Sequence, residues 1–131
     1  MKNLPPLNIL VVDDEESIRH MLLMVLENAG MHVTTVATAE EAQKSLAETS
    51  VDLLVLDWML PGISGIELTR RLKNDPKFAA LPVILLTARA ERDDRIRAFE
   101  VGVNDYITKP FSPRDLIIRI NSAINISKNL N

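Results

Sequence analysis

The stretch Val51–Gly65, VDLLVLDWMLPGISG, decides how the rest of the sequence is interpreted. Its apolar run Leu53–Leu56 ends abruptly on an acid, Asp57, and such a short run bounded by polar residues is typical of a buried strand in a parallel sheet. Asp57 would then stand at the carboxyl end of that strand, where open α/β sheets bind their ligands. A cap of the following turn is the plainer interpretation of the same aspartate. The residues at the ends of the other predicted strands distinguish a ligand-binding Asp57 from a turn-capping one.

The composition of the chain indicates one folded domain. It has 131 residues, of which 47% are hydrophobic, enough for a single core. The 15 basic and 18 acidic residues give a net charge of −3 without a basic cluster, so we expect no direct nucleic-acid contact by this segment. No apolar run approaches the roughly 20 residues of a membrane span, and residues 1–7 lack the apolar core of a signal peptide. The absence of cysteine fits a reducing compartment, and we expect a cytoplasmic protein.

Five short apolar runs alternate with stretches of helical periodicity. The predicted strands are residues 8–12, 32–36, 53–56, 82–87 and 105–108. The predicted helices run from about residue 18 to 29, from 38 past 46, from 64 to 74, through 96 and 99 to 102, and from 112 to 126.

This alternation predicts the fold class and the domain boundaries. Short loops and right-handed crossovers make it an α/β fold, a (βα)₅ doubly wound, five-stranded parallel sheet. The folded domain is predicted at residues 8–126, after an N-terminal extension at 1–7. The polar tail at 127–131 is expected to fray or to begin a linker. Ile96 and Phe99 are predicted on the inner face of the fourth helix, although both also lie on or near a candidate interaction surface.

Residues whose side chains could bind a ligand or take part in a reaction lie at the carboxyl ends of four of the five predicted strands. In chain order they are Asp13 and Asp14, Asp57, Thr87, and Lys109 with Pro110. The carboxyl ends of parallel strands meet at one edge of a sheet, so three carboxylates, a hydroxyl and an ammonium group would converge there. Carboxylates packed so closely repel each other unless a cation lies among them, and all-oxygen ligands suit Mg²⁺. A carboxylate can also act as a nucleophile towards phosphorus, with a lysine to bind a phosphoryl oxygen.

These residues, each at its own strand end, resemble the receiver domain of two-component response regulators over residues 8–124. The resemblance implies the flavodoxin/CheY-like strand order 2-1-3-4-5. It implies a phosphorylation-operated switch rather than a turnover enzyme. Asp57 would accept a phosphoryl group from a sensor histidine kinase, and Thr87 and Lys109 would contact that group.

The same resemblance implies a magnesium site and a particular backbone geometry. Asp14 and Asp57 would be direct ligands of Mg²⁺, Asp13 would act through water, and the backbone carbonyl of Met59 would complete the protein's share. The peptide bond between Lys109 and Pro110 would be cis.

Three segments, LDWMLPG, LLTAR and DYITKPFSP, are similar to the receivers of winged-helix transcription factors of the PhoB type. That branch implies control of transcription through a DNA-binding domain absent from this chain. A stand-alone phosphorelay or docking receiver is the alternative.

The branch also implies a homodimer that forms on phosphorylation through the fourth helix, the fifth strand and the fifth helix. The residues expected on this face are Arg95, Ile96, Phe99, Asp105, Asp115, Ile118 and Arg119. Arg95 would pair with Asp115 and Asp105 with Arg119 across the two-fold axis. Asn104 stands where the branch usually has an acid, so we expect a weak dimer.

Two aromatic residues near the predicted site have alternative interpretations. Tyr106 is either a switch that turns inward when Thr87 moves towards the phosphoryl group, or an exposed strand tyrosine. Trp58 follows Asp57 and is expected at the rim of the site, because neighbouring strand residues point to opposite faces.

Two other functions use the same fold class. Phosphohydrolases of the haloacid dehalogenase type need a second acid two residues after the nucleophile, where this chain has Met59. A flavodoxin-like carrier would cradle a phosphate in its first loop, and the acidic DDEES segment would repel one. Met59 and Arg89 flank Asp57 and provide no group that orients water well, so we expect slow hydrolysis of the phosphoryl group.

Overall fold

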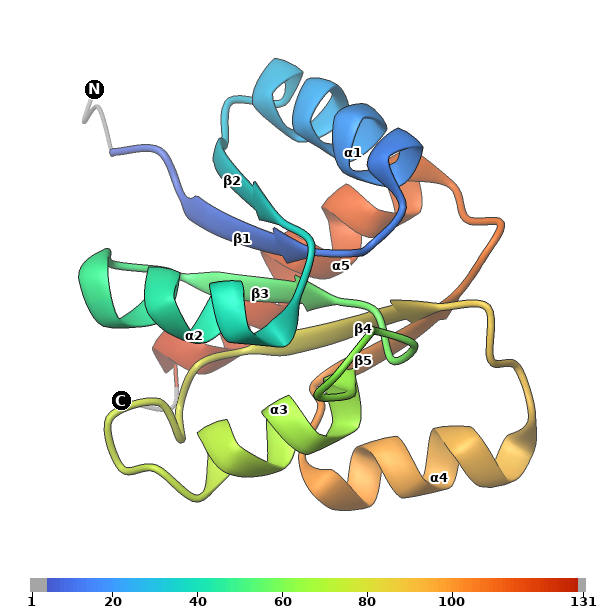
Figure 1. Cartoon of the computed structure of the whole chain (residues 1–131). Coiled ribbons are helices and arrows are strands. Elements are labelled where there is room, and N and C mark those ends of the chain that lie inside the picture. The colour runs from blue at the N-terminus through green and yellow to red at the C-terminus, as the bar shows by residue number, and fades with distance from the viewer. Residues whose placement is uncertain (1–4, 130–131) are drawn as a thin grey trace.

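The computed structural model describes residues 5–129. Its five strands form one parallel sheet, with helices on both faces (Figure 1). The strands are β1 (Asn8–Val12), β2 (His32–Val36), β3 (Leu53–Leu56), β4 (Val83–Thr87) and β5 (Asp105–Thr108). Their order across the sheet is β2-β1-β3-β4-β5. The predicted doubly wound α/β fold is therefore confirmed, and so is the strand order.

Five helices connect and cover the strands. They are α1 (Glu16–Asn28), α2 (Ala39–Glu48), α3 (Gly65–Lys73), α4 (Arg92–Val101) and α5 (Pro113–Asn129). α1 and α5 cover one face of the sheet, and α2, α3 and α4 cover the other (Figure 1). α2 begins at the predicted capping box: the Glu41 amide donates to Thr38 Oγ1 at 3.1 Å. Within residues 5–129, no helix has both the length and the apolar character that a membrane crossing requires.

The central strands are buried on both faces, which explains their unbroken apolar sequences. Leu54 and Leu56 of β3 point into the core beneath α2 and α3, while Leu53 and Val55 point into the core beneath α1 and α5. All four are at most 1% exposed. Such a sheet is a rigid base, and residues placed just after its strands are held close together.

Two predictions about the helices were wrong. Ile96 and Phe99 are 45% and 47% exposed, and Ala98 is the buried residue of α4. A three-residue spacing marks one side of a helix, but it does not say which side faces the sheet. Within the described residues α5 continues to Asn129, past residue 126, because residues 127–129 contain no proline or glycine to stop it. The remaining ends of the predicted extension and tail, residues 1–4 and 130–131, lie outside the described residues.

Candidate functional site

Asp13 and Asp57 lie level with each other at the carboxyl edge of the sheet. Val12 and Leu56 are paired in the register of β1 and β3, so the two aspartates follow at matching positions. The Asp57 amide donates to the Val12 carbonyl at 3.0 Å, which extends the backbone pairing to the residue itself. Both side chains are nearly buried, at 2% and 5% exposure. The sheet therefore fixes the spacing of these two carboxylates.

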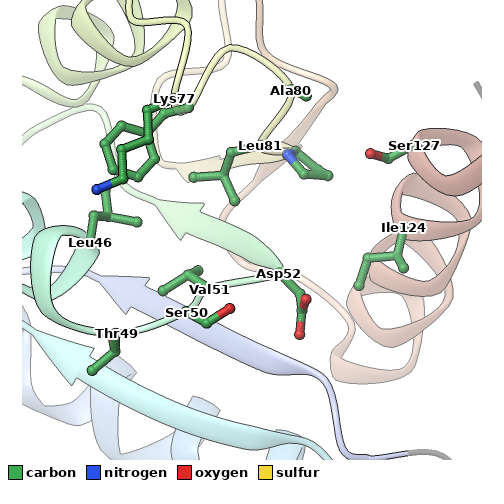
Figure 2. Close-up of a pocket in the computed structure, with 12 residues that line it drawn as sticks. Leu46, Thr49, Ser50, Val51, Asp52, Lys77, Ala80, Leu81, Ile124 and Ser127 are labelled. Atoms are coloured by element: carbon green, nitrogen blue, oxygen red, sulfur yellow. The ribbon is translucent and has the colours of Figure 1, made fainter. Parts of the chain in front are cut away.

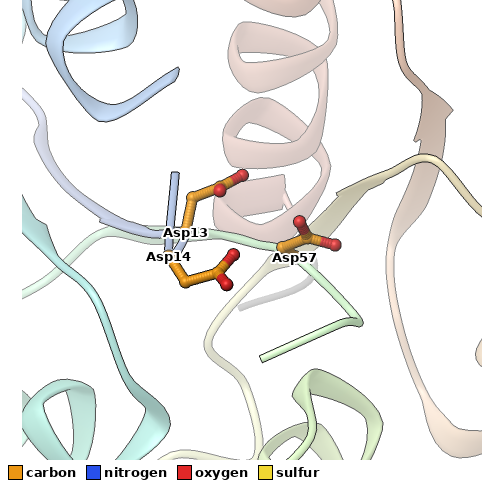
Figure 3. Close-up of side chains that lie close together, drawn as sticks. All are labelled: Asp13, Asp14 and Asp57. Carbon is orange, nitrogen blue, oxygen red and sulfur yellow. The ribbon is translucent and has the colours of Figure 1, made fainter. Parts of the chain in front are cut away.

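Asp14 completes a group of three carboxylates (Figure 3). One carboxylate oxygen from each of Asp13, Asp14 and Asp57 lies within 4.8 Å of the others. Asp14 is exposed, whereas its two neighbours are buried. Among residues 5–129, this is the one group of three or more acidic or histidine side chains close enough to hold a metal ion.

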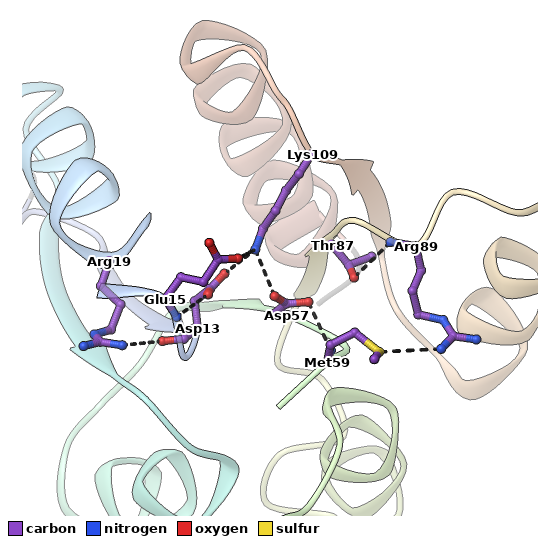
Figure 4. A network of polar contacts seen from close by, with 8 residues as sticks. All are labelled: Asp13, Glu15, Arg19, Asp57, Met59, Thr87, Arg89 and Lys109. Atoms are coloured by element: carbon purple, nitrogen blue, oxygen red, sulfur yellow. Dashed lines mark hydrogen bonds and ion pairs between the residues drawn. The ribbon is translucent and has the colours of Figure 1, made fainter. Parts of the chain in front are cut away.

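Lys109 connects the buried acids. Its Nζ donates to Asp13 Oδ2 at 2.8 Å and to Asp57 Oδ2 at 2.9 Å, and it lies 3.4 Å from Glu15 Oε1 (Figure 4). Burial disfavours the charge on Lys109, but the hydrogen bonds and charges of Asp13 and Asp57 outweigh it, so the pKa of the ammonium is raised. The peptide bond between Lys109 and Pro110 is cis. The hydrogen bonds to Asp13 and Asp57 fix the Lys109 ammonium as a cation between the two buried acids.

The neighbourhood of Asp13 favours a further cation. Burial raises the pKa of its carboxyl, and the nearby Asp57 adds to the rise, while Lys109 and the Glu15 amide oppose it. The Glu15 amide donates to Asp13 Oδ1 at 2.9 Å, and Arg19 Nη1 donates to the Asp13 carbonyl at 2.8 Å. One ammonium thus faces three carboxylates, and the site carries excess negative charge.

The donor set fits Mg²⁺. Oxygen ligands suit this ion, and it commonly uses one or two carboxylates together with water. Asp57 Oδ1 accepts a hydrogen bond from the Met59 amide at 3.1 Å, and Oδ2 accepts one from Lys109, so each oxygen keeps further lone pairs. The exposed Asp14 faces this space, with no hydrogen bond to its carboxylate among residues 5–129. These residues fit the ion without rearrangement of the strands.

Thr87 and Tyr106 are connected through the segment that follows β4. Thr87 is fully buried, and its Oγ1 lies 3.4 Å from the Arg89 amide, which donates to it. The Tyr106 hydroxyl donates to the Arg89 carbonyl at 2.6 Å, and Tyr106 is only 1% exposed. Burial raises the pKa of that hydroxyl. Tyr106 therefore points inward here, which excludes the exposed strand tyrosine for this structure.

Trp58, expected at the rim of the site, is buried. It is 6% exposed, with the guanidinium of Arg89 4.4 Å from its ring centroid and that of Arg97 at 5.7 Å. Two cation–π contacts therefore cover the indole. The alternation of strand residues could not reveal this, because both arginines come from the β4–α4 region, far away in the sequence.

Gly65, the last residue of the stretch that carries Asp57, packs against the backbone of the site. Its amide donates to the Trp58 carbonyl at 2.9 Å, and a Cβ added there would lie 2.0 Å from the Asp57 carbonyl oxygen. The first turn of α3 thus packs directly on the backbone that carries Asp57. A glycine directly after the Ser64 cap was the one available sequence signal.

The face formed by α4, β5 and α5 carries the three apolar residues that were expected at a dimer interface. Ile96, Phe99 and Ile118 are all between 45% and 58% exposed. Arg119, however, already bonds within its own chain, to Asp105 Oδ1 at 2.8 Å and to Asp115 Oδ2 at 2.9 Å. The expected pairs across a two-fold axis would therefore have to replace or share existing contacts.

A separate hollow lies at the amino-terminal edge of the sheet (Figure 2). It has a volume of about 380 Å³, and Asp52, Lys77 and Ser127 are its polar lining residues besides Thr49 and Ser50. Asp52 accepts a hydrogen bond from the Asn8 amide at 2.7 Å, which ties β1 to the start of β3. The hollow is remote from the carboxylates, and its acid already has a structural partner.

Comparison with known proteins agrees with this geometry. A family model described as response regulator receiver domain matches residues 9–121. The chain therefore belongs to the response regulator receivers, which are signalling switches. It is 48% identical over 116 residues to the phosphate regulon transcriptional regulatory protein PhoB of Pseudomonas aeruginosa, covering 88% of this chain and 51% of that protein. The chain spans about half the length of the curated relatives it matches.

Solved receivers share the fold. A response regulator receiver domain protein from Clostridium thermocellum superposes with a TM-score of 0.87 at 34% identity, over 95% of this chain and 99% of that chain. A CheY-like receiver domain protein from Methanospirillum hungatei has a TM-score of 0.89 at 27% identity, over 96% and 99% of the two chains.

Proposed function

We propose that this receiver is switched by phosphorylation of Asp57, with the phosphoryl group supplied by a phosphohistidine on a sensor histidine kinase. The observation that carries the proposal is the convergence of Asp13, Asp14 and Asp57 within 4.8 Å, with Lys109 bonded to two of them. A structural ion-pair cluster would not need Asp14, whose carboxylate has no partner in the part of the chain that the structure describes. A phosphotransfer site needs it to hold Mg²⁺.

Each residue has a role in the transfer. A carboxylate oxygen of Asp57 attacks phosphorus, the new P–O bond forms as the P–N bond breaks, and the electron pair returns to the imidazole of the kinase. Lys109 already lies 2.9 Å from Asp57 Oδ2 and would neutralise charge on the phosphoryl oxygens. The buried Thr87 would donate a hydrogen bond to another of these oxygens.

Asp14, Asp57 and the Met59 carbonyl would bind Mg²⁺ directly, and Asp13 would bind it through water. When bound, the ion supplies charge neutralisation for both the carboxylates and the transferred group. The burial of Asp13 and Asp57 strengthens these interactions, because the local dielectric is low.

The test uses a small phosphodonor. Incubation with phosphoramidate and Mg²⁺ should add the mass of one phosphoryl group, and the adduct should be labile to alkali. Asp57→Asn should abolish the adduct, because an amide is a poor nucleophile. Asp52→Asn, at the other edge of the sheet, is the matched control and should be phosphorylated normally. An adduct that persists in Asp57→Asn would assign the phosphoacceptor to another residue.

The output proposed for the switch is dimerisation through the α4–β5–α5 face, and with it control of transcription by a DNA-binding domain outside this chain. Exposed Ile96, Phe99 and Ile118 support the proposal, as does the similarity to PhoB. Arg119→Asp should oppose a beryllofluoride-dependent shift from monomer to dimer without preventing phosphorylation. Sedimentation with the same monomer fraction before and after beryllofluoride would leave a monomeric docking module.

A further inference from the structure

Arg89 lies in the loop between β4 and α4, beside the proposed phosphorylation site, and its side chain makes several contacts there. Its Nη2 donates to Asp94 Oδ1 at 2.8 Å, its Nη1 lies 3.5 Å from Met59 Sδ, and its guanidinium lies over the Trp58 ring. Its Nε is buried and has no hydrogen-bond partner among residues 5–129. A guanidinium has five N–H donors, and this one has a single strong acceptor. Nε is therefore the one donor of this group that is both buried and without a partner among the described residues.

We propose that Arg89 is a second cation for the phosphoryl group on Asp57, and that Asp94 competes with the phosphoryl group for it. The inference rests on the proposed phosphorylation of Asp57 and adds a specific anion-binding residue to that site. Before phosphorylation Asp94 holds the guanidinium, and after phosphorylation the guanidinium donates to a phosphoryl oxygen.

The charges of the site favour this exchange. Lys109 and one bound divalent ion would balance the charges of the three carboxylates. Phosphorylation replaces the single charge of the Asp57 carboxylate by about two on the phosphoryl group, which leaves about one negative charge in excess. Lys109 is already shared between Asp13 and Asp57. Another cation close to the site therefore lowers the energy of the phosphorylated form, and planar Arg matches phosphoryl oxygens well.

The position of Arg89 makes it the suitable cation. Its Nη1 contacts Met59, whose amide donates to Asp57 Oδ1 at 3.1 Å, and its own amide lies 3.4 Å from Thr87 Oγ1. Its side chain and its backbone thus reach the two groups that flank the phosphoacceptor (Figure 4). The side chain is 37% exposed, so it has room to turn without disturbing the core.

Arg97 is the natural control, because it also contacts the Trp58 ring, at 5.7 Å, but comes from the second turn of α4. Removing its charge perturbs the indole in a similar way without taking a cation from beside Met59. A general effect of either arginine on folding or on Trp58 would appear in both variants.

The experiment measures beryllofluoride binding by titration calorimetry at saturating Mg²⁺, with Mg²⁺ binding measured separately. Arg89→Gln should weaken beryllofluoride binding about fivefold or more and change Mg²⁺ affinity by less than about twofold. Arg97→Gln should leave both affinities unchanged. Asp94→Asn should tighten beryllofluoride binding about two- to fivefold, because it removes the competing acid. In the Arg89→Gln background, Asp94→Asn should have no effect.

The direction in which Asp94→Asn changes beryllofluoride affinity distinguishes competition for Arg89 from a merely structural role of Asp94. If Asp94 only positions Arg89, its substitution weakens beryllofluoride binding as Arg89→Gln does, and the inference is overturned. Equal affinities in Arg89→Gln and wild type also overturn it. A wild type that fails to bind beryllofluoride, and is not phosphorylated by phosphoramidate, refutes the proposed function itself. If the wild type binds beryllofluoride and the Arg89 and Asp94 variants bind it with the same affinity, only the role of Arg89 is refuted.

Discussion

Gly65→Ala tests whether the first turn of α3 sets the position of Asp57. The added Cβ would lie 2.0 Å from the Asp57 carbonyl oxygen and 3.0 Å from Trp58 Cα. Ordinary van der Waals contact begins near 3.4 Å, so the backbones must separate by about 1.4 Å. Overpacking of this kind costs about 1–3 kcal/mol in the free energy of unfolding. The better helix propensity of alanine returns at most about 1 kcal/mol.

The larger effect should be on binding. Sites of this kind tolerate displacements of only about 0.5 Å, and a shift of about 1 Å can cost about a hundredfold. We therefore expect Gly65→Ala to lose about 1–2 kcal/mol of stability in urea titrations and to weaken Mg²⁺ and beryllofluoride binding by tenfold or more, that is by at least about 1.4 kcal/mol.

Gly30→Ala is the matched control. Gly30 has φ of +90° and nothing within 4 Å of an added Cβ, so its substitution strains the backbone without a clash. It should cost about 1 kcal/mol of stability and leave Mg²⁺ and beryllofluoride affinities unchanged. Gly65→Ala with wild-type affinities for both ligands would refute the role assigned to this turn.

Three further predictions concern the site itself. Asp14→Ala removes a direct ligand and should weaken Mg²⁺ binding at least about tenfold in calorimetry; equal affinity would exclude the proposed metal site. Lys109→Met leaves Asp13 without its cation, so the already raised pKa of that carboxyl rises further. A folded-state pKa above the unfolded value means that stability is lost as pH rises through it. Without Mg²⁺, urea titrations should therefore show a loss of about 1–3 kcal/mol near pH 8 and a smaller loss near pH 5. The phosphoryl group should persist for many minutes or longer, and Met59→Asn, which adds a water-orienting carboxamide, should shorten its lifetime about tenfold. Decay within seconds in the wild type would contradict this.

The sheet and the site could be predicted from sequence because both depend on local patterns. Four of the five apolar runs end on or just before a functional polar residue, and parallel strands bring those ends to one edge; the family resemblance then implied the strand order that makes Asp13 and Asp57 neighbours. Ile96 and Phe99 could not be placed, because periodicity gives one side of a helix but not its rotation relative to the sheet. The contacts of Arg89 depend on a loop whose side chains take their direction from tertiary packing. The clash at Gly65 depends on the approach of two backbones, which no residue pattern encodes.

The central place of β3 has a consequence for amide hydrogen exchange. β3 pairs with β1 on one side and with β4 on the other, and the Asp57 amide donates to the Val12 carbonyl. Amides in such a position exchange only when the whole domain unfolds, whereas an element with little burial opens locally. α4, with Ala98 as its buried residue, is such an element. A covalent change on Asp57 would therefore act on the most protected part of the domain, and the altered exchange should be seen mainly in α4.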